Sequence, residues 1–492
     1  MKKIFFFFAA ICALSACDFP DTLPPVFDTN TTAVYINDGP TAGSYILSGN
    51  ITLSSSYNWN VENSAPTHIT LDSNNGSGGV NYLRPQLTDK LKALLADPDK
   101  HFTLVAGEGY LIATLIFSAP SYAGSSHSVS IYYVPTPPIP IRTKEDLMAI
   151  NDDEESLSRH YILMESIDLQ SAEWTPIGSR EDGKRFTGSF NGNGYHISNL
   201  KVRSDLLFVG LFGCIDSDEG NIAVQDLQLV DVDIEGDCAG AVAGYLMSGI
   251  IQGCSVTGVG SKIAGVLGAG GIAGFSDGSI QNCSAAGAVN ADGDDSCAGG
   301  IAGFSPGSIQ NCSAAGAVNA DGEGALVGGI AGYSFENSIQ NCFATGAVSA
   351  SGDFSNVGGI VGFSSGSIQN CYAMGAVSAS GDDSCVGGIV GSSVGGIQDC
   401  VALNSSVSGN SVGRVVGAID LGNGTFSNNY GWEGMIGGSW GNVALDGNDG
   451  ADVDVALYKN ANWWKNATNW FGGAWDFTDT WAWGLDGLPV LR

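Results

Sequence analysis

Basic residues are scarce in this chain of 492 residues: Lys and Arg number 19 against 50 Asp and Glu, which gives a formal net charge of −31. Binding to nucleic-acid phosphates needs a basic surface, so this imbalance argues against nucleic acid as a partner. It also disfavours attraction to anionic lipid. All charged residues together make up only 14% of the chain, whereas roughly 25% is usual in globular proteins.

Apolar runs long enough to span a bilayer are also lacking. The N-terminal run Ile4–Leu14 has eleven residues, too few for a transmembrane helix. It follows two lysines and ends in Leu14-Ser15-Ala16-Cys17, which resembles the lipobox of bacterial lipoproteins. The resemblance implies a signal peptide over 1–16 and a lipid on Cys17, whose acyl chains hold the protein at the membrane. An ordinary secretory signal that contains a Cys is the alternative.

Composition divides the next part of the chain into three segments. Residues 17–31 are rich in proline and predict an extended tether. Residues 32–134 alternate strand-like stretches (33–36, 44–47, 68–71 and 128–134) with Gly, Asn and Ser turns, which predicts a β-rich module. Within it, Thr88 is a plausible helix N-cap, followed by an apolar face of Leu91, Leu94 and Leu95. Residues 135–140 form a proline-rich linker.

Repeats dominate the remaining chain. The phrase Ala269-Gly270-Gly271-Ile272-Ala273-Gly274 has close copies beginning at 298, 327, 357 and 386, spaced by 29 or 30 residues. Such a period is typical of a solenoid. None of the repeats has a helical periodicity; each consists of short β-like pieces separated by small residues. The sequence therefore predicts an all-β fold, a parallel β-helix with about eight coils over 209–430.

The amino-acid sequence of the repeats resembles that of a known family. Gly271-Ile272-Ala273-Gly274-Phe275, followed by Ile280-Gln281-Asn282-Cys283, is similar to the GLUG-motif repeats of bacterial surface proteins. The resemblance extends over 141–492, including the start of the solenoid (141–208) and a Trp-rich C-terminal cap (431–492). It implies a surface scaffold of the kind found in lipoproteins, adhesin-like proteins and parts of IgA-peptidase variants. It does not imply a reaction.

The beginning of the solenoid has its own signals. Thr143 followed by Asp146 predicts a capped helix, with Leu147 and Ile150 on the side that would cover the open end of the first coil. The stretch 161–194 that follows is hairpin-like in its alternation.

Several residue types recur in register from coil to coil. Ile, Val and Ala columns predict a narrow apolar interior, and an Asn column suits left-handed corners with amides bonded between coils; a binding role for that column is the alternative. A Cys column predicts a buried ladder of free thiols in preference to disulfides, because stacked Cβ atoms would lie too far apart. The Asn column is Asn282, Asn311, Asn341 and Asn370, and the Cys column is Cys254, Cys283, Cys312, Cys342, Cys371 and Cys400.

No catalytic residue is predicted. The Gly-x-Ser-x-Gly pattern of serine hydrolases occurs four times in the repeats, for example at Gly303–Gly307, but equivalent copies indicate equivalent turns. The last histidine is His196, so no imidazole follows any of these serines. An enzyme that cleaves anionic polysaccharides is disfavoured because Lys262 is the only basic residue between 209 and 413. A glycosidase that uses two carboxylates stays open.

Two sets of residues are candidates for binding. Carboxylates at one position of successive repeat turns offer the oxygen ligands that calcium prefers and are a candidate calcium site. Closely spaced tryptophans near the C-terminus favour an aromatic plug that seals the last coil, with glycan stacking as the alternative. The carboxylates are Asp294, Glu323, Asp353 and Asp382, and the tryptophans are Trp463, Trp464, Trp470 and Trp475.

These observations predict a lipid-anchored protein of the bacterial cell envelope, at the outer membrane or cell surface, that acts as a non-enzymatic binding or adhesion scaffold. The expected partners are the membrane, through the lipid, and a host or environmental glycan or protein. A glycan-active enzyme is the main alternative, and an accessory module of a peptidase system is a weaker one.

Overall fold

The structure of the protein is a computed structural model. It describes residues 27–28, 33–38, 45–47, 51–55, 59–71, 73, 75–76, 79–83, 85–88, 90–91, 103–105, 109–118, 126–134, 138–181, 183–217, 220–419 and 425–492. The predicted signal peptide, Cys17 and most of the tether lie outside these residues. The chain forms two compact units, one of Met1–Leu104 with Gly109–Pro135 and the other of Val105–Glu108 with Thr136–Arg492.

The N-terminal unit is built from β-strands around a small apolar core. Its largest sheet contains β2 (Ala33–Asp38), β3 (Tyr45–Leu47), β5 (Trp59–Asn63), β7 (Asn75–Gly76), β10 (Thr103–Val105), β11 (Gly109–Ser118) and β12 (Ser126–Val134). Two smaller sheets contain β1 (Phe27–Asp28), β4 (Ile51–Ser55) and β8 (Gly79–Leu83), and β6 (Ile69–Leu71) with β9 (Pro85–Leu87). The Thr88 hydroxyl accepts the N–H of Leu91 at 3.2 Å, as a helix N-cap does; Leu94 and Leu95 lie outside the described residues.

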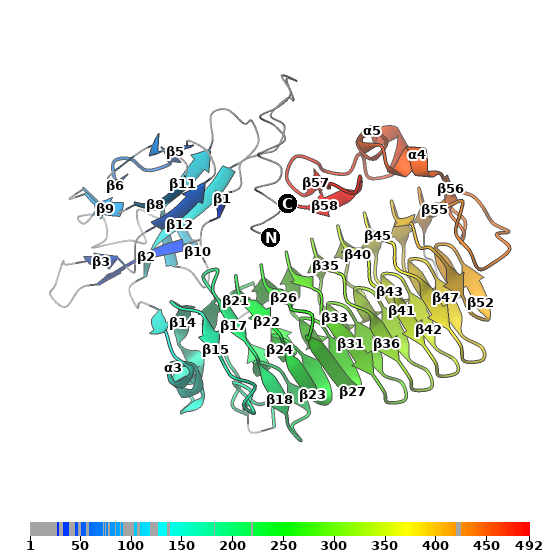
Figure 1. The fold of residues 1–492 in the computed structure, drawn as a ribbon, viewed down its shortest axis with the longest axis horizontal. Coiled ribbons are helices and arrows are strands. Elements are labelled where there is room, and N and C mark those ends of the chain that lie inside the picture. The colour runs from blue at the N-terminus through cyan, green and yellow to red at the C-terminus, as the bar shows by residue number, and fades with distance from the viewer. Residues whose placement is uncertain are drawn as a thin grey trace, which may run out of the picture. The chain divides into compact units, whose positions relative to one another are not determined.

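The second unit is a parallel β-solenoid, which confirms the predicted fold (Figure 1). One coil shows the pattern: β31 (Ala288–Ala291) and β32 (Cys297–Gly299) lie in one sheet, and β33 (Ala302–Ser305), β34 (Ile309–Gln310) and β35 (Ser313–Ala314) each lie in another. Each strand pairs in parallel with the same strand of the next coil, for example Ile280 with Ile309. We number the four sheets in chain order within this coil: sheet 1 contains β31 and β32, sheet 2 contains β33, sheet 3 contains β34 and sheet 4 contains β35.

Sheet 1 has fourteen strands, several of them two to a coil. They are β18 (Lys201–Arg203), β19 (Phe208–Val209), β23 (Asp233–Gly240), β27 (Lys262–Gly270), β31, β32, β36 (Val318–Ala320), β37 (Leu326–Gly328), β41 (Val348–Ala350), β42 (Asn356–Gly358), β46 (Val377–Ala379), β47 (Cys385–Gly387), β51 (Val407–Ser408) and β52 (Ser411–Gly413).

Sheet 2 has eight strands. They are β20 (Phe212–Asp216), β24 (Ala243–Ser248), β28 (Ala273–Ser276), β33, β38 (Ala331–Ser334), β43 (Val361–Ser364), β48 (Val390–Ser393) and β53 (Val416–Ile419).

Sheets 3 and 4 have eleven strands each. Sheet 3 consists of β13 (Ile139–Ile141), β14 (His160–Leu163), β16 (Ser189–Asn191), β21 (Ile222–Gln225), β25 (Ile250–Gln252), β29 (Ser279–Gln281), β34, β39 (Ile339–Gln340), β44 (Ile368–Gln369), β49 (Ile397–Gln398) and β54 (Phe426–Ser427). Sheet 4 consists of β15 (Ile167–Asp168), β17 (His196–Ser198), β22 (Gln228–Val230), β26 (Ser255–Thr257), β30 (Ser284–Ala285), β35, β40 (Phe343–Ala344), β45 (Tyr372–Ala373), β50 (Val401–Ala402), β55 (Tyr430–Trp432) and β56 (Ala451–Val453).

The solenoid begins earlier than the repeats suggest, and it has about nine turns where about eight were predicted. The stretch 161–194 is not a hairpin, because β14 pairs with β16 in parallel and both belong to sheet 3. Before it, α3 (Lys144–Met148) begins at Thr143 with the predicted capping box, in which Thr143 and Asp146 bond each other's backbone N–H. Leu147 and Ile150 are fully buried against the first coil. Two short 3₁₀ helices, Ala149–Asn151 and Ser156–Ser158, complete this end.

The interior follows the predicted columns. The isoleucines of sheet 3 are fully buried from Ile251 to Ile397, and so are Val289 of β31, Val318 of β36 and Val377 of β46. Burial of an Ile side chain contributes about 1.5–3 kcal/mol to the free energy of folding. Each coil that stacks on the previous one therefore adds a similar amount to the stability of the solenoid.

Glycine is required where the backbone of one coil touches the next. A Cβ on Gly300 would lie 2.2 Å from the carbonyl oxygen of Gly329, and one on Gly388 would lie 2.0 Å from that of Arg414. Arg414 occupies the same column in the last coil, where no further coil blocks a side chain. Its guanidinium is buried and donates to the carbonyls of Asp449 and Gly450, at 2.9 Å each, and to the Asp452 carboxylate at 2.7 Å. Together with the buried side chain of Met435, it closes this end of the interior.

The Asn column forms the predicted ladder at a left-handed corner. Asn282, Asn311, Asn341 and Asn370 have φ between 53° and 55°. The Asn311 amide donates to the Asn282 side-chain oxygen at 3.1 Å, and Asn341 donates to Asn311 in the same way. Asparagine in this column thus has two roles: it tolerates the left-handed backbone conformation, and its side-chain amide links neighbouring coils.

We expect Asn341→Ala to lower the free energy of unfolding by about 2–3 kcal/mol, because Ala loses the amide bonds and also pays roughly 1–2 kcal/mol for positive φ. Asn341→Gly should lose only the amide bonds and cost about 1 kcal/mol. Urea unfolding followed by circular dichroism measures both. Equal losses for the two variants would contradict the assigned role of the left-handed corner.

Candidate functional site

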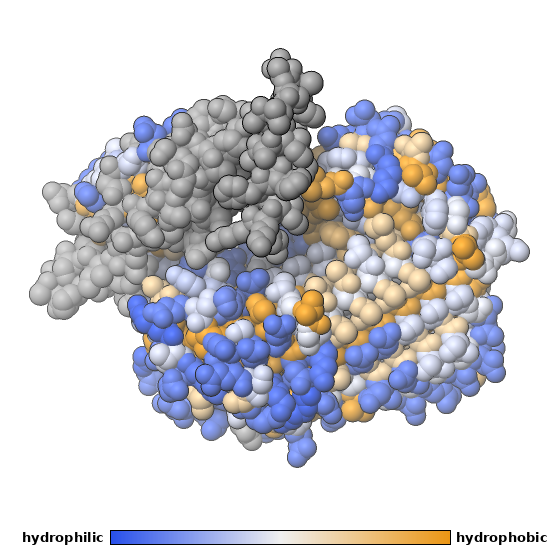
Figure 2. All heavy atoms as spheres, in the orientation of Figure 1, coloured by the Kyte–Doolittle hydropathy of each residue, from blue (hydrophilic) through white to orange (hydrophobic). Residues whose placement is uncertain are grey.

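The outer surface of the solenoid repeats with the coils. Outward side chains of paired parallel strands stand in register, so each position of the repeat forms a column along the stack. Figure 2 shows the result as stripes of similar hydropathy that cross the coils. A candidate site on this surface is therefore either a column, which offers one chemistry many times, or a place where a column is interrupted.

The acidic column lies on turns that are inserted into sheet 1. In β27 the two residues Val266 and Leu267 occupy a place that holds five residues, 292–296, in the next coil. The turns carry the predicted carboxylates, all exposed: Asp294, Glu323, Asp353 and Asp382.

Two of these carboxylates, Asp294 and Asp353, already accept hydrogen bonds within this column. One oxygen of Asp294 accepts the N–H of Glu323 at 3.0 Å, and one of Asp353 accepts the N–H of Asp382 at 2.7 Å. In the part of the chain that the structure describes, no group of three or more His, Cys, Asp or Glu is arranged to hold a metal ion. Calcium at this column stays a prediction.

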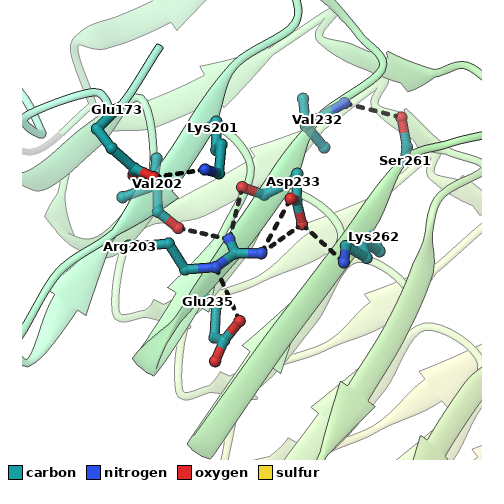
Figure 3. A network of polar contacts seen from close by, with 9 residues as sticks. All are labelled: Glu173, Lys201, Val202, Arg203, Val232, Asp233, Glu235, Ser261 and Lys262. Carbon is teal, nitrogen blue, oxygen red and sulfur yellow. Dashed lines mark hydrogen bonds and ion pairs between the residues drawn. The ribbon is translucent and has the colours of Figure 1, made fainter. Parts of the chain in front are cut away.

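Basic residues on sheet 1 are confined to the coils before the acidic turns and are paired there (Figure 3). Arg203 donates to both oxygens of Asp233, at 2.8 and 2.9 Å, and also contacts Glu235 at 2.8 Å. Lys262 reaches Asp233 from the next coil at 3.1 Å. Partial burial raises the pKa of Asp233, but the hydrogen bonds from Arg203 and Lys262 outweigh it and lower that pKa below its ordinary value.

This network ends at Lys262, because the paired position in the next coil is Ala288. From there the outward residues of sheet 1 are Asn290, Asn319 and Ser349, joined by side-chain hydrogen bonds of 3.1 and 2.7 Å. The acidic turns of the later coils therefore have no basic side chain beside them in the same column. We call the line of carboxylates formed by Asp294, Glu323, Asp353 and Asp382 the acidic ridge; its negative charge is not neutralised within the column.

An aromatic column follows sheet 2. The rings of Phe275, Phe304, Tyr333 and Phe363 are stacked with centroids 5.0, 4.9 and 5.5 Å apart. The ring faces of Phe304 and Tyr333 are nearly parallel, at 7°. The ring faces between Phe275 and Phe363 are thus covered by neighbouring rings and are not available to a sugar. The stacking stabilises the coils by about 0.5–1.5 kcal/mol for each pair.

The serines of the four Gly-x-Ser-x-Gly segments are structural. Ser276, Ser305, Ser364 and Ser393 are fully buried. Each hydroxyl donates to the carbonyl of the glycine two residues later, at 3.0 to 3.3 Å. This confirms the interpretation of these segments as equivalent turns.

The ten described cysteines are all free thiols, as predicted. In the main column the N–H of Cys312 donates to the sulfur of Cys342 at 3.4 Å, and the Cys312 thiol lies 3.1 Å from the carbonyl oxygen of Gln310. The column ends at Asn429, which takes the place of a sulfur: its oxygen accepts the N–H of Cys400 at 3.1 Å, and its amide donates to Ile397 at 2.8 Å. Burial raises the pKa of Cys254 and Cys400 well above the usual range.

The four candidate tryptophans lie in a second apolar cluster on the side of the solenoid. Their exposed fractions are 9% for Trp463, 0% for Trp464, 4% for Trp470 and 2% for Trp475. The cluster packs on outward residues of sheet 4; the rings of Trp464, Trp475 and Trp481 all lie within 6.4 Å of the Tyr372 ring. It covers a lateral face, whereas the end of the last coil is closed by Arg414 and Met435.

The segment that carries these tryptophans runs back along the coils (Figure 1). It contains α4 (Val455–Tyr458), α5 (Ala461–Trp464), a 3₁₀ turn at Ala467–Asn469, and the antiparallel pair β57 (Trp481–Trp483) and β58 (Pro489–Leu491).

Hydrogen bonds from Tyr372 and to Asp399 help to fix this segment to the solenoid. The Tyr372 hydroxyl donates to the carbonyl of Pro489 at 2.6 Å. Asp399, which follows the Asn column, accepts the N–H groups of Phe471 and Gly472 at 2.6 and 3.0 Å. Burial raises the pKa of Asp399. Sequence reasoning missed this docking; the signal was the change of the outward column of sheet 4 from serine to Phe343 and Tyr372.

Comparison with known proteins supports the repeat assignment. Residues 323–349 match the model of the GLUG motif, which confirms the predicted resemblance of the repeats to this motif. It is 31% identical over 170 residues to halomucin of Haloquadratum walsbyi, a match that spans 30% of this chain and 2% of halomucin. It is 36% identical over 107 residues to a provisionally named Gly-rich membrane protein of Evansella cellulosilytica, spanning 20% of this chain and 12% of that protein.

One solved structure matches this chain with a low TM-score. It is that of a provisionally assigned immunoglobulin A1 protease from Bacteroides ovatus, at 19% sequence identity and a TM-score of 0.46, covering 72% of this chain and 92% of that one. Of halomucin and the Gly-rich membrane protein, by contrast, the chain spans only 2% and 12% of the length. Within the described residues, we find no helix with the length and apolar character needed to cross a bilayer.

We expect the thiols to be inert in the folded protein. Iodoacetamide should leave the main column unlabelled even at pH 9, because these thiols are buried and out of reach of the reagent, and because burial raises the pKa of Cys254 and Cys400; the half-buried Cys385 is the one site where slow labelling is expected. In denaturant without reductant, all ten described cysteines should be alkylated, as read by mass spectrometry. Recovery of column cysteines as disulfides would contradict the free-thiol ladder.

Proposed function

We propose that this protein is a non-enzymatic binding or adhesion scaffold of the bacterial cell envelope, held at the membrane by a lipid on Cys17. The observation that carries the proposal is the register of the coils: the same outward side chains return at the same place in successive coils. A ligand with repeating groups can engage several coils together, which raises its overall affinity without any single strong site.

The names of two relatives support a surface location. Halomucin and the Gly-rich membrane protein match this chain over 170 and 107 residues, and a membrane or surface setting is consistent with the lipobox-like segment. The acidic ridge is the column best suited to a partner, since it is exposed, regular and not neutralised locally. We expect it to bind a cationic or calcium-bridged surface on a host or environmental glycan or protein.

A glycan-active enzyme is the alternative function. Catalysis needs one asymmetric set of groups with tuned pKa values, whereas the carboxylates of the ridge stand at equivalent turns and the serines of the Gly-x-Ser-x-Gly segments are buried and bonded. If a single carboxylate substitution abolished turnover of a glycan, the enzyme would replace the scaffold.

Graded neutralisation tests the proposal. Asp294→Asn alone should change adhesion of protein-coated beads to a glycan and host-protein array by less than about twofold, because the other coils still bind. The combined Asp294→Asn, Glu323→Gln, Asp353→Asn and Asp382→Asn variant should lose at least about tenfold. A charge-matched control converts four exposed carboxylates outside the column to amides: Glu165, Asp205, Glu433 and Asp446.

Two results of this comparison would count against the ridge. Equal losses in the column variant and its control would show that net charge alone matters, and abolition by the single substitution would indicate one unique site. Titration of both variants with CaCl₂ decides the calcium prediction: a rise in melting temperature should occur in the wild type and the control but not in the column variant.

Two substitutions in the N-terminal segment test the proposed lipid anchor. Cys17→Ser should abolish incorporation of a palmitate analogue and release the protein from the membrane fraction or leave it uncleaved, because the acyl chains supply the membrane affinity. Cys12→Ser is the matched control, since it removes a thiol five positions earlier and should leave labelling intact. Normal fractionation of Cys17→Ser would contradict the lipid anchor.

A further inference from the structure

The outward column of sheet 4 changes character along the stack. It reads Ser255, Ser284 and Ser313, and then becomes aromatic at Phe343 and Tyr372. The Trp-rich segment covers the aromatic part of this column. The end of that segment, residues 477–492, is called the tail here, and part of it lies against the serines.

A pocket of about 280 Å³ lies where the tail meets the serines. Its floor contains Asn282, Ser284, Asn311 and Ser313, from two successive coils, and its wall contains Asp479 and Arg492 from the tail. Thr480 and Leu491 also line it. The floor belongs to the repeat and the wall does not, so the other described coils do not reproduce this combination of residues.

The tail holds the side chain of Arg492 in place. The Arg492 guanidinium donates to the carbonyl of Trp481 at 3.1 Å and to that of Phe477 at 2.8 Å, through Nε and one Nη. Its second Nη has no bond to any described residue. The Asp479 carboxylate likewise makes no hydrogen bond or ion pair with the described residues. The wall thus offers one donor and one acceptor beside the amides and hydroxyls of the floor.

We propose that this pocket binds a neutral saccharide unit, as a specific site separate from the acidic ridge. A sugar presents hydroxyl groups that both donate and accept, and these match a floor of amides and serine hydroxyls with Asp479 and Arg492 at the side. Leu491 supplies an apolar contact for a ring face. The volume lies just below the roughly 300–1,000 Å³ of pockets that enclose drug-sized ligands, which suits one or two sugar units.

Other ligand classes fit this site less well. A peptide that adds a strand needs an open sheet edge, but β30 is paired on both sides, with β26 and β35, and β35 is paired with β30 and β40. An anionic ligand would meet Asp479 and a chain of net charge −31. The floor residues are polar, so an apolar helix has no groove to fill.

Calorimetric titration of the full chain with maltohexaose, cellohexaose, mannohexaose and chitohexaose tests the proposal. At least one of these probes should bind with a stoichiometry of one. Ser313→Leu fills the pocket and should weaken that binding by tenfold or more. Ser255→Leu is the matched control, because Ser255 stands in the same column outside the pocket, and it should bind as the wild type does.

A second variant guards against misfolding of Ser313→Leu. Asp479→Asn keeps the shape of the wall and should weaken binding at least threefold with an unchanged circular dichroism spectrum. Binding of none of the probes, or wild-type affinity in both Ser313→Leu and Asp479→Asn, would overturn the saccharide site. The ridge variant with four neutralised carboxylates should bind the probe normally, so failure here leaves the scaffold proposal standing, and loss of adhesion in the ridge variant leaves this site standing.

Discussion

Everything in the solenoid depends on the distance between coils, which the backbone hydrogen bonds of parallel strands fix at about 4.8 Å. A residue can occupy an inward or corner column only if its copies tolerate one another at that spacing. Isoleucine does so by packing, asparagine by amide bonds, and cysteine by accepting an N–H at its sulfur. At Gly300 no side chain is tolerated, because a Cβ would lie 2.2 Å from the carbonyl oxygen of the next coil.

The same constraint explains how the stack ends. A column that stops leaves one set of groups without a partner, and buried polar groups need partners. Asn429 replaces the next sulfur with an amide that both accepts and donates. Asp399 follows the asparagines and accepts two N–H groups of the C-terminal segment. Arg414 extends from the glycine column into the space that a further coil would fill. Each terminal residue thus differs in type from the column it ends and supplies partners for the groups that the column leaves open.

The sequence predicts these columns well because the repeat period places equivalent residues at visible intervals. The solenoid, the interior, the Asn ladder, the buried thiols and the capped first helix all follow from spacing and side-chain type. The stretch 161–194 was misinterpreted because its coils vary in length, so its parallel pairing leaves no regular period. The docking of the tail was missed for a related reason: Tyr372 and Pro489 are 117 residues apart, and no period connects them.

This difference has a consequence for function. A perfectly periodic surface offers many equal contacts and no unique one, so it suits avid attachment to a ligand that is itself repetitive. Specific recognition of one small group needs donors and acceptors that converge from different directions. In this molecule the tail supplies the second direction, because it crosses the coils and adds Asp479 and Arg492 to a floor made of repeat residues. The protein therefore combines two kinds of surface, and the unique one arises where a segment outside the repeats lies against them.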